Sequence, residues 1–359
     1  MAINLTTKYS DKVLERFTKQ SLTASAASKD YEFEGIKTLK IYSVDTAPLN
    51  DYTRSGTSRY GTVSELQDTT QTLTMTQDKS FTYSIDKGNE KEQLNIKSAN
   101  RSLKREIDEV ITPHLDKYNL SAWCMGAGSI ITDGGTAPTK TTITGLVMDC
   151  TEALDEAFAP EVGRTMFITN AQYKLLKQNP DFLNVDNLAQ KALVKGQVGE
   201  IDGMRVVKVP SKYMPANVYW LIVHKGAILA PSKLQDYKIH SDPPGINGDL
   251  VEGRIMHDAF VLGAKAAAVC ICAANSAVLK TATITDTSAS SKYTLSNTTS
   301  GATYYYTTDG TDPRYSDTKT AVPSDGIPYA SVEGAKVLKV AGISSTAGTY
   351  NSGVAELTL

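Results

Sequence analysis

The sequence predicts an α+β fold followed by a small all-β domain. Residues 46–275 mix strand-like alternation with amphipathic helical stretches, as an α+β protein does. From residue 281 onward the chain is rich in serine and threonine, and short strand-like runs recur between turns. The chain has 359 residues, a length that suits two or three domains better than one.

Composition limits the classes of protein to which this chain can belong. Hydrophobic residues make up 41% and charged residues 21%, which is enough to bury a sizeable core. The formal net charge is -2, so no strong basic field attracts nucleic acid by charge alone. The charged N-terminal residues argue against a signal peptide, and no run of about 18 apolar residues predicts a membrane span. We therefore expect the protein to fold in a reducing cytoplasm.

The N-terminal zone contains one predicted helix and one stretch of small residues. Residues 8–20 fit an amphipathic helix, and residues 21–28 read SLTASAAS, which we interpret as a flexible segment. A surface helix with a linker is the simpler interpretation. An arm that reaches a neighbouring subunit is the alternative.

A hairpin and a long helix form the most informative part of the chain. Residues 73–75 and 81–85 alternate in polarity around a polar stretch at 77–80, which predicts two antiparallel strands joined by a turn. Asn89 and Glu92 have the spacing of a capping box at a helix start. Pro113 is expected to kink or end the first half of a spine of roughly 30 residues, about 45 Å long. The apolar stripe of this helix consists of Ile96, Ala99, Leu103, Ile107, Val110 and Ile111.

Helices and strands alternate over the rest of the α+β zone. Residues 144–158 fit a helix whose stripe ends at Phe158, and Asn170 is expected to cap a short helix after a strand at 165–169. Strand-like runs follow at 204–209, at 218–223 and at 254–273, where Gly263 separates two strands.

Cysteines and histidines supply few candidates for chemistry. The four cysteines form no C-x-x-C pair, and Cys270 and Cys272 fit small core residues on one face of a strand. His257 and Asp258 are neighbours in a strand-like run and would point to opposite faces, which favours a structural polar pair over a catalytic or metal-binding dyad. No G-x-S-x-G, P-loop or dinucleotide motif is present. We expect no catalytic residue, no cofactor and no metal site.

Two patterns flank the charged turn before the long helix. An F-x-x-x-x-D element closes the second strand, and a V-x-x-P-x-x-D-x-Y element lies within the helix. Their residues are Phe81 and Asp86, then Val110, Pro113, Asp116 and Tyr118. In this order, and together with segments 164–178 and 247–274, they resemble the major capsid proteins of tailed bacteriophages over roughly residues 1–275.

The resemblance implies the Hong Kong 97-like capsid fold and, with it, a division of the chain into domains. It implies an N-terminal arm at 1–44, an extended β-hairpin loop at 45–86, a peripheral domain with the spine helix at 87–144, an axial domain at 145–245 and closing strands of the peripheral domain at 246–275. A linker at 276–280 would then lead to the last domain at 281–359. The inter-subunit or structural candidates are Phe81, Asp86, Leu103, Ile107, Pro113, Asp116 and Tyr118.

The C-terminal zone carries a separate motif. Asp309 and Asp312 could suggest calcium, but Asp-Gly and Asp-Pro are also ordinary turn chemistry, which we favour. The string around them resembles the immunoglobulin-like C-terminal module of chitobiase and β-hexosaminidase, which implies an all-β decoration domain on the shell surface with possible glycan or bacterial-surface contact. The motif residues are Tyr306, Asp309, Gly310, Asp312 and Pro313.

The resemblance implies a structural function and not an enzymatic one. Subunits would assemble into hexamers and pentamers of an icosahedral head around double-stranded DNA, without sequence-specific contacts. Because the chain passes from Met1 almost directly into the arm, scaffolding is expected either from a separate protein, which we favour as a partner beside the portal, or to be unnecessary. The location would be the virion, after assembly in the host cytoplasm. An encapsulin-like shell protein, and a carbohydrate-active enzyme or adhesin, are the alternatives.

Overall fold

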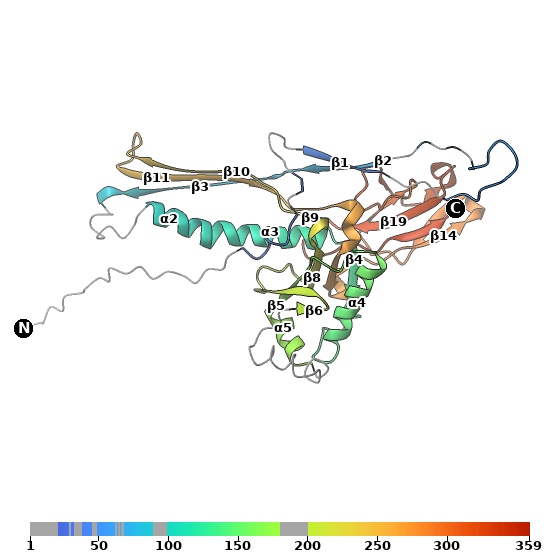
Figure 1. The fold of residues 1–359 in the computed structure, drawn as a ribbon, viewed down its shortest axis with the longest axis horizontal. Helices are drawn as coiled ribbons and strands as arrows, with labels where there is room; N and C mark the ends of the chain where they lie inside the picture. The colour runs from blue at the N-terminus through green and yellow to red at the C-terminus, as the bar shows by residue number, and fades with distance from the viewer. Residues whose placement is uncertain are drawn as a thin grey trace, which may run out of the picture.

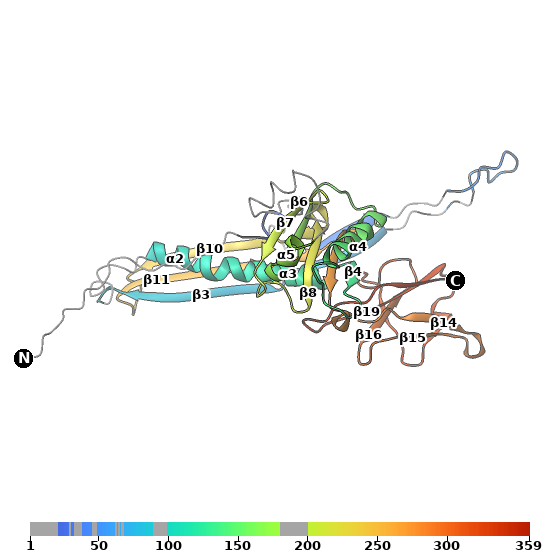
Figure 2. The ribbon, with the colours of Figure 1, turned by 90° about the horizontal axis from the view of Figure 1, so that it is seen from below.

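The molecule is elongated, with a long sheet and the spine helix running side by side. The computed structural model describes residues 21–28, 30, 31, 38–44, 49–61, 63, 65, 68–88, 99–179 and 200–359. A six-stranded sheet and its helices project from one side of the spine helix, and the C-terminal domain lies at the carboxyl end of that helix (Figures 1 and 2).

The spine helix is continuous through the predicted break. It consists of α2 (Ala99–Glu106), a π-helical turn (Ile107–Ile111) and α3 (Thr112–Met125). Pro113 therefore does not end the helix: it lies in the first turn of α3, directly after the π-helical turn. The predicted capping residues Asn89 and Glu92 lie outside the described residues, as does Ile96.

The π-helical turn also changes which side chains face the core. Ile111 is buried, whereas Val110 is 51% exposed, so its predicted place in the buried stripe is wrong. An extra residue in the turn rotates the following side chains by about 100° relative to a regular α-helix. Leu103 is half-buried against the long sheet, as its spacing predicts.

The long sheet has three antiparallel strands in the order β10-β11-β3. These are β10 (Ser232–Ser241), β11 (Gly248–His257) and β3 (Gln77–Asp86). Ile85 and Val251 form a cluster with Ala99 of the helix, and Phe81 and Leu103 pack at its edge. Gly253 lies opposite Phe81, and a Cβ there would come within 2.3 Å of the Phe81 ring, so glycine lets the ring lie against the strand.

The predicted pairing within the hairpin is wrong. β2 (Asp68–Thr74) pairs with β1 (Thr38–Val44), and the next strand, β3, pairs with β11 instead of folding back on β2. Residues 77–80, predicted as a turn, are part of β3. The extended hairpin therefore begins at Thr38, inside the segment assigned to the arm. The prediction missed this because local alternation indicates strands without identifying their partners.

The six-stranded sheet has the order β4-β13-β8-β5-β7-β6 and is mixed. Its strands are β4 (Ser129–Thr132), β13 (Val269–Ala273), β8 (Val218–His224), β5 (Arg164–Thr169), β7 (Met204–Val209) and β6 (Glu200–Ile201). Helices α4 (Ile143–Glu156) and α5 (Asn170–Lys177) pack on it. The main core of the protein is buried between this sheet, α4 and the carboxyl half of the spine helix.

Three details of this region differ from the sequence predictions. Phe158 is 95% exposed with a φ of 54°, because α4 ends at Glu156 and its stripe stops at Leu154. Thr169, and not Asn170, is the N-cap of α5: its hydroxyl accepts a hydrogen bond from the amide of Gln172. Third, the strands of the six-stranded sheet come from more than one of the predicted domain ranges.

Three strands lie in a different sheet from the one that the predicted domain ranges imply. β4, assigned to the peripheral domain, and β13, assigned to its closing strands, both lie in the six-stranded sheet. β10, assigned to the axial domain, lies in the long sheet. The predicted ranges anticipated one return of the chain, at 246–275, but local patterns do not show which sheet a returning strand completes.

A small apolar cluster lies where the hairpin joins the rest of the molecule. The strands β9 (Ile228–Leu229) and β12 (Phe260–Val261) pair there, and Leu73, Met75 and Leu262 are buried against them. Short 3-10 turns at Lys225–Ala227, Gly263–Ala268 and Asn275–Ala277 complete the connections.

The C-terminal domain is all-β, as its composition predicts. One sheet has the order β14-β15-β18 and the other β17-β16-β19-β20. The strands are β14 (Thr283–Thr287), β15 (Lys292–Ser296), β18 (Ile327–Pro328), β17 (Thr320–Ala321), β16 (Thr303–Thr307), β19 (Val337–Ile343) and β20 (Ala355–Thr358). Side chains from both sheets share one core, which includes Tyr306, Ile327 and Val340. Residues 276–280 are packed, because Leu279 is buried and its amide donates to the carbonyl of Tyr350.

Candidate assembly site

Residues 21–28, predicted from the sequence to belong to an arm, are attached to the spine helix by one buried carboxylate. Asp116 is 1% exposed, and its oxygens accept hydrogen bonds from the Ser21 hydroxyl (2.8 Å), the Leu22 amide (2.9 Å), and the hydroxyl (2.7 Å) and amide (3.2 Å) of Thr23. The Asn119 side chain also donates to the Thr23 hydroxyl. The described residues 21–28 are therefore an anchored segment, and the expected flexibility is wrong, because small residues can also pack closely against a helix.

A second carboxylate fixes the corner between the hairpin and the long sheet. Asp258 is 4% exposed and accepts hydrogen bonds from the Tyr118 hydroxyl (2.7 Å), the Thr76 amide (2.7 Å) and the Ala259 amide (2.8 Å). Burial and the neighbouring Asp258 raise the pKa of Tyr118 to about 12, so its hydroxyl remains a donor. Asp116 and Tyr118 of the capsid-like pattern thus attach the arm and the hairpin corner to the same helix.

His257 lies beside this corner without forming a dyad with Asp258. Its ring is 1% exposed and meets the rings of His114 and Tyr118 edge to face, at centroid distances of 5.3 and 5.1 Å. Neither ring nitrogen has a hydrogen-bond partner among the described protein atoms. Burial lowers the pKa of His257; the charges of His114 and Lys79 act in the same direction, and that of Asp258 opposes them.

Acid is therefore expected to destabilise the subunit at this corner. Because the pKa of His257 is lower in the folded chain, the unfolded chain binds more protons once the pH falls below about 6.5. The contribution of neutral His257 to stability is complete above that pH and declines below it. Denaturant unfolding between pH 7 and pH 5 should show a shallower pH dependence for His257→Phe than for the wild type; identical slopes would contradict this.

The hairpin is a two-stranded ribbon that packs on the small apolar cluster at its root and exposes apolar side chains farther out. β1 and β2 form a sheet of their own, and Tyr42 and Val44 on β1 are each 64% exposed. Beyond the strands, Leu49 and Val63 are 102% and 96% exposed. The tip is ordered by its own contacts: the Tyr52 and Tyr60 rings meet at 5.1 Å, and the amide of Thr53 donates to the carbonyl of Arg59. An isolated ribbon with exposed apolar side chains is marginal in water and is suited to rest on another surface.

The remaining sequence candidates occupy structural positions. Phe81 covers Gly253, Asp86 ends β3 and accepts a hydrogen bond from the Gly88 amide, and Ile107 begins the π-helical turn. The structure thus brings Asp116 to the arm and Tyr118 to the hairpin corner, while Phe81 and Leu103 share the cluster under the long sheet.

The C-terminal motif forms a closed turn. Asp309 accepts hydrogen bonds from the amide and hydroxyl of Thr311 and from the Thr318 hydroxyl, which together lower its pKa although burial opposes them. Gly310 has a φ of 81°, which favours glycine. Tyr306 and Pro313 are buried. The carboxylates are therefore used within the turn, as the turn interpretation predicts.

Two side chains that follow this motif have a role that sequence reasoning missed. The Asp312 carboxylate binds the guanidinium of Arg314 in a fork, with Nε–Oδ1 and Nη2–Oδ2 distances of 3.0 and 2.7 Å. Arg314 and Tyr315 then reach carbonyls at the end of the spine helix. No sequence signal predicts these partners, which lie more than 180 residues earlier.

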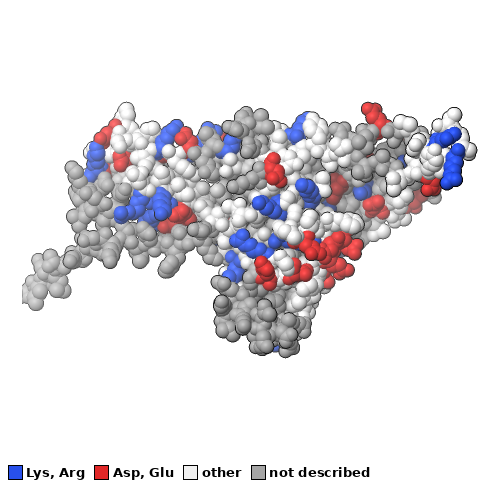
Figure 3. Space-filling model, viewed as in Figure 1, with Lys and Arg blue, Asp and Glu red and all other residues white. Residues whose placement is uncertain are grey.

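The described part of the chain contains no candidate metal site and no candidate membrane-spanning helix. There, no three His, Cys, Asp or Glu side chains gather as a metal site, and no helix is long and apolar enough to cross a membrane. Cys124, Cys150, Cys270 and Cys272 are free and buried. Over the face drawn in Figure 3, basic side chains gather over α2 and acidic ones over α4, so both signs are present there.

The fold is similar to that of phage structures in comparisons with known proteins. A chain from Mycobacterium phage Che8 superposes with a TM-score of 0.63 at 19% identity, covering 75% of this chain and 96% of that chain. The capsid structure of the cyanophage P-SCSP1u gives 0.62 at 17% identity, over 75% and 92% of the two chains. The mature capsid of bacteriophage PhiM1 gives 0.61 at 11% identity, over 76% and 92%.

The sequence itself gives no further match. No family model matches the chain, and no curated protein matches it. The likeness therefore concerns the fold, and it leaves about a quarter of this chain outside the superposition. By fold, this chain is similar to the capsid proteins of bacteriophages.

Proposed function

We propose that the chain is the major capsid protein of a tailed bacteriophage, with a Hong Kong 97-like fold. The observation that carries this proposal is the similarity to chains of phage capsid structures over more than nine tenths of their length. A match that covers almost the whole of another chain supports a shared architecture and not one shared motif. A structural role, and not catalysis, follows from this proposal.

The architecture supports self-assembly by a specific physical route. The exposed apolar side chains of the hairpin gain by burial against a second copy of the chain, since each fully buried aliphatic side chain contributes roughly 1.5–3 kcal/mol. The subunit fixes the base of this ribbon through Asp258, Tyr118 and the cluster around Met75. A rigid base with a projecting apolar ribbon can join many identical subunits into one shell.

The finer parts of the proposal follow from this role. Subunits would form hexamers and pentamers of an icosahedral head that encloses double-stranded DNA without sequence-specific contacts. A scaffolding protein and a portal would be the partners in assembly, within the host cytoplasm. The all-β domain would be immunoglobulin-like and lie at the shell surface, and titration of the full-length protein with glycans tests whether it contacts them.

Replacing exposed apolar side chains of the hairpin with aspartate tests self-assembly. In Leu49→Asp/Val63→Asp, two fully exposed side chains change, so the free energy of unfolding of the subunit should change by less than about 1 kcal/mol. Assembly, followed by sedimentation, should fall by at least about tenfold, since carboxylates would have to be buried in the contact. The control Leu49→Met/Val63→Ile keeps both positions apolar and should assemble as the wild type does. Equal assembly of the aspartate variant would refute the role of the hairpin.

A further inference from the structure

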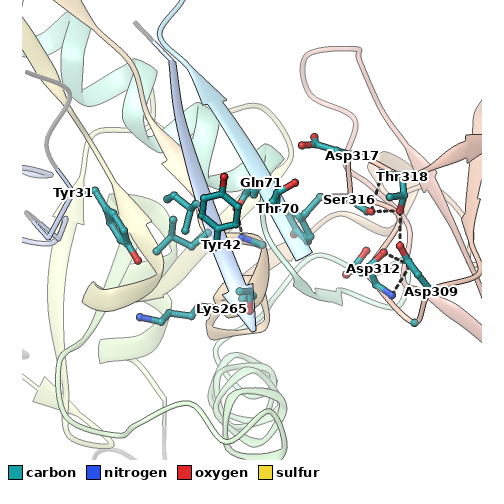
Figure 4. A pocket seen from close by; sticks show the side chains of 18 residues that line it. Tyr31, Tyr42, Thr70, Gln71, Lys265, Asp309, Asp312, Ser316, Asp317 and Thr318 are labelled. Carbon is teal, nitrogen blue, oxygen red and sulfur yellow. Dashed lines mark hydrogen bonds between the residues drawn. The ribbon is translucent and has the colours of Figure 1, made fainter. Parts of the chain in front are cut away.

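The C-terminal domain contacts the rest of the subunit through one loop and one later segment. The loop, residues 309–318, is here named the bracing loop. It faces the root of the hairpin across a groove of about 760 Å³, which Figure 4 shows with Tyr42 and Gln71 on one side and Asp309, Ser316 and Thr318 on the other. Hydrogen bonds of Asp309 and the Ser316–Thr318 hydroxyl pair hold the loop in shape.

The domain supplies donors to the carboxyl end of the spine helix, at Met125 and Gly126, and to Gly128 in the turn that follows. The last carbonyls of any helix lack partners within it. Here the Asn351 side chain donates to Met125 (3.1 Å), the Tyr315 hydroxyl to Gly126 (2.9 Å) and Arg314 to Gly128 (2.9 Å). The Arg314 side chain is 6% exposed and is held by Asp312, so its donor is placed before it meets the carbonyl.

The same loop reaches the root of the hairpin. Asp317 accepts a hydrogen bond from the Thr72 hydroxyl of β2 at 3.0 Å. Tyr315 packs against Gly263, where an added Cβ would lie 2.8 Å from the Tyr315 Cβ. Gly263 in turn donates its amide to the Gln71 side chain, which also donates to the carbonyl of Val261. The bracing loop thus joins the end of the spine helix to the first residues of the projecting ribbon.

We propose that the C-terminal domain is an integral brace of the subunit: its bracing loop caps the spine helix and fixes the direction in which the hairpin leaves the body. This goes beyond a decoration attached to a finished shell, since the domain would be needed to present the hairpin for assembly. That last step rests on the proposed capsid function, whereas the bracing itself does not.

Removal of two hydroxyl groups tests the brace in the full chain. The variant Thr72→Val/Tyr315→Phe keeps both side-chain volumes but loses the bonds to Asp317 and Gly126. Hydrogen exchange of the unassembled subunit, read by mass spectrometry, should accelerate roughly tenfold at residues 120–126 and 70–74. Exchange in β19 should not change. The matched control Thr287→Val/Tyr329→Phe removes the same two kinds of hydroxyl from the same domain, at hydrogen bonds with Thr294 and Asp286 that lie away from the bracing loop, and should leave both segments unchanged.

The outcomes separate the brace from the capsid function. Unchanged exchange in both segments, or uniform acceleration over the whole chain, would overturn the brace. If exchange accelerates locally but shells assemble as in the wild type, the brace is not needed to present the hairpin for assembly. If the wild type itself never assembles, the capsid function fails while the exchange data still decide whether the loop braces the helix and the hairpin.

Discussion

Asp116→Ala is expected to release the arm and to lower the free energy of unfolding by about 3–5 kcal/mol. The carboxylate is the shared acceptor of Ser21, Leu22 and Thr23, and its loss leaves two amides and two hydroxyls near the helix without that acceptor. Equilibrium denaturation measures the loss. Limited proteolysis should then cut within residues 21–28 of the variant, whereas the wild type is expected to resist cutting there.

Asp116→Asn is the matched control for this effect. It keeps the volume of the side chain and one oxygen acceptor, but its amide group donates where the arm needs acceptors. A loss smaller than that of the alanine variant is expected. An alanine variant with the denaturation midpoint and proteolytic pattern of the wild type would show that the arm is not held by this carboxylate.

Tyr350→Ala is expected to be similarly severe, at about 3–5 kcal/mol. Tyr350 lies in the C-terminal zone, yet it is 0% exposed and packs in the main core of the preceding α+β region. Its hydroxyl donates to the carbonyl of Ala216 at 2.5 Å, and its amide donates to Ala277. Truncation would leave a large cavity between the two regions.

Comparison of Tyr350→Ala with Tyr350→Phe separates the free-energy cost of the cavity from that of the lost hydrogen bond. Phenylalanine keeps the ring and loses only the bond to Ala216, at a cost of about 1–2 kcal/mol. Denaturant unfolding of both variants, followed by fluorescence, measures the difference. An alanine variant as stable as the phenylalanine variant would indicate that the core does not depend on this ring.

The sequence predicted element types better than element partners. Alternation at 73–85 correctly indicated extended structure, but β3 pairs with β11, which lies about 170 residues later, and not with β2. Polar residues at 77–80 resemble a turn when they are read locally. In the sheet, residues 78–80 are exposed strand positions and Gln77 is half-buried, and tertiary pairing overrides the local preference.

Helical periodicity failed at one position for a definable reason. The stripe of the spine helix placed Val110 in the core, and the π-helical turn at Ile107–Ile111 turns it outward while Ile111 stays buried. A regular 3.6-residue repeat cannot anticipate an inserted residue. Thr169 was missed as a cap in a similar way, since both it and Asn170 are good capping residues and only backbone geometry separates them.

The candidate site was predictable in its residues and not in its contacts. Asp116 and Tyr118 were singled out by a pattern, but their partners Thr23 and Asp258 lie far away in the sequence. The change in composition near residue 281 indicated the C-terminal domain. That Arg314 and Tyr350 reach back into the first region has no counterpart in composition or periodicity.

The most direct test of the capsid proposal is negative-stain electron microscopy of the purified full-length protein, with light scattering on the same sample. The proposal predicts closed shells, or rings of five and six subunits, with a scattering mass of many subunits. A population that stays monomeric or dimeric over a range of protein and salt concentrations would contradict self-assembly as the function of this chain.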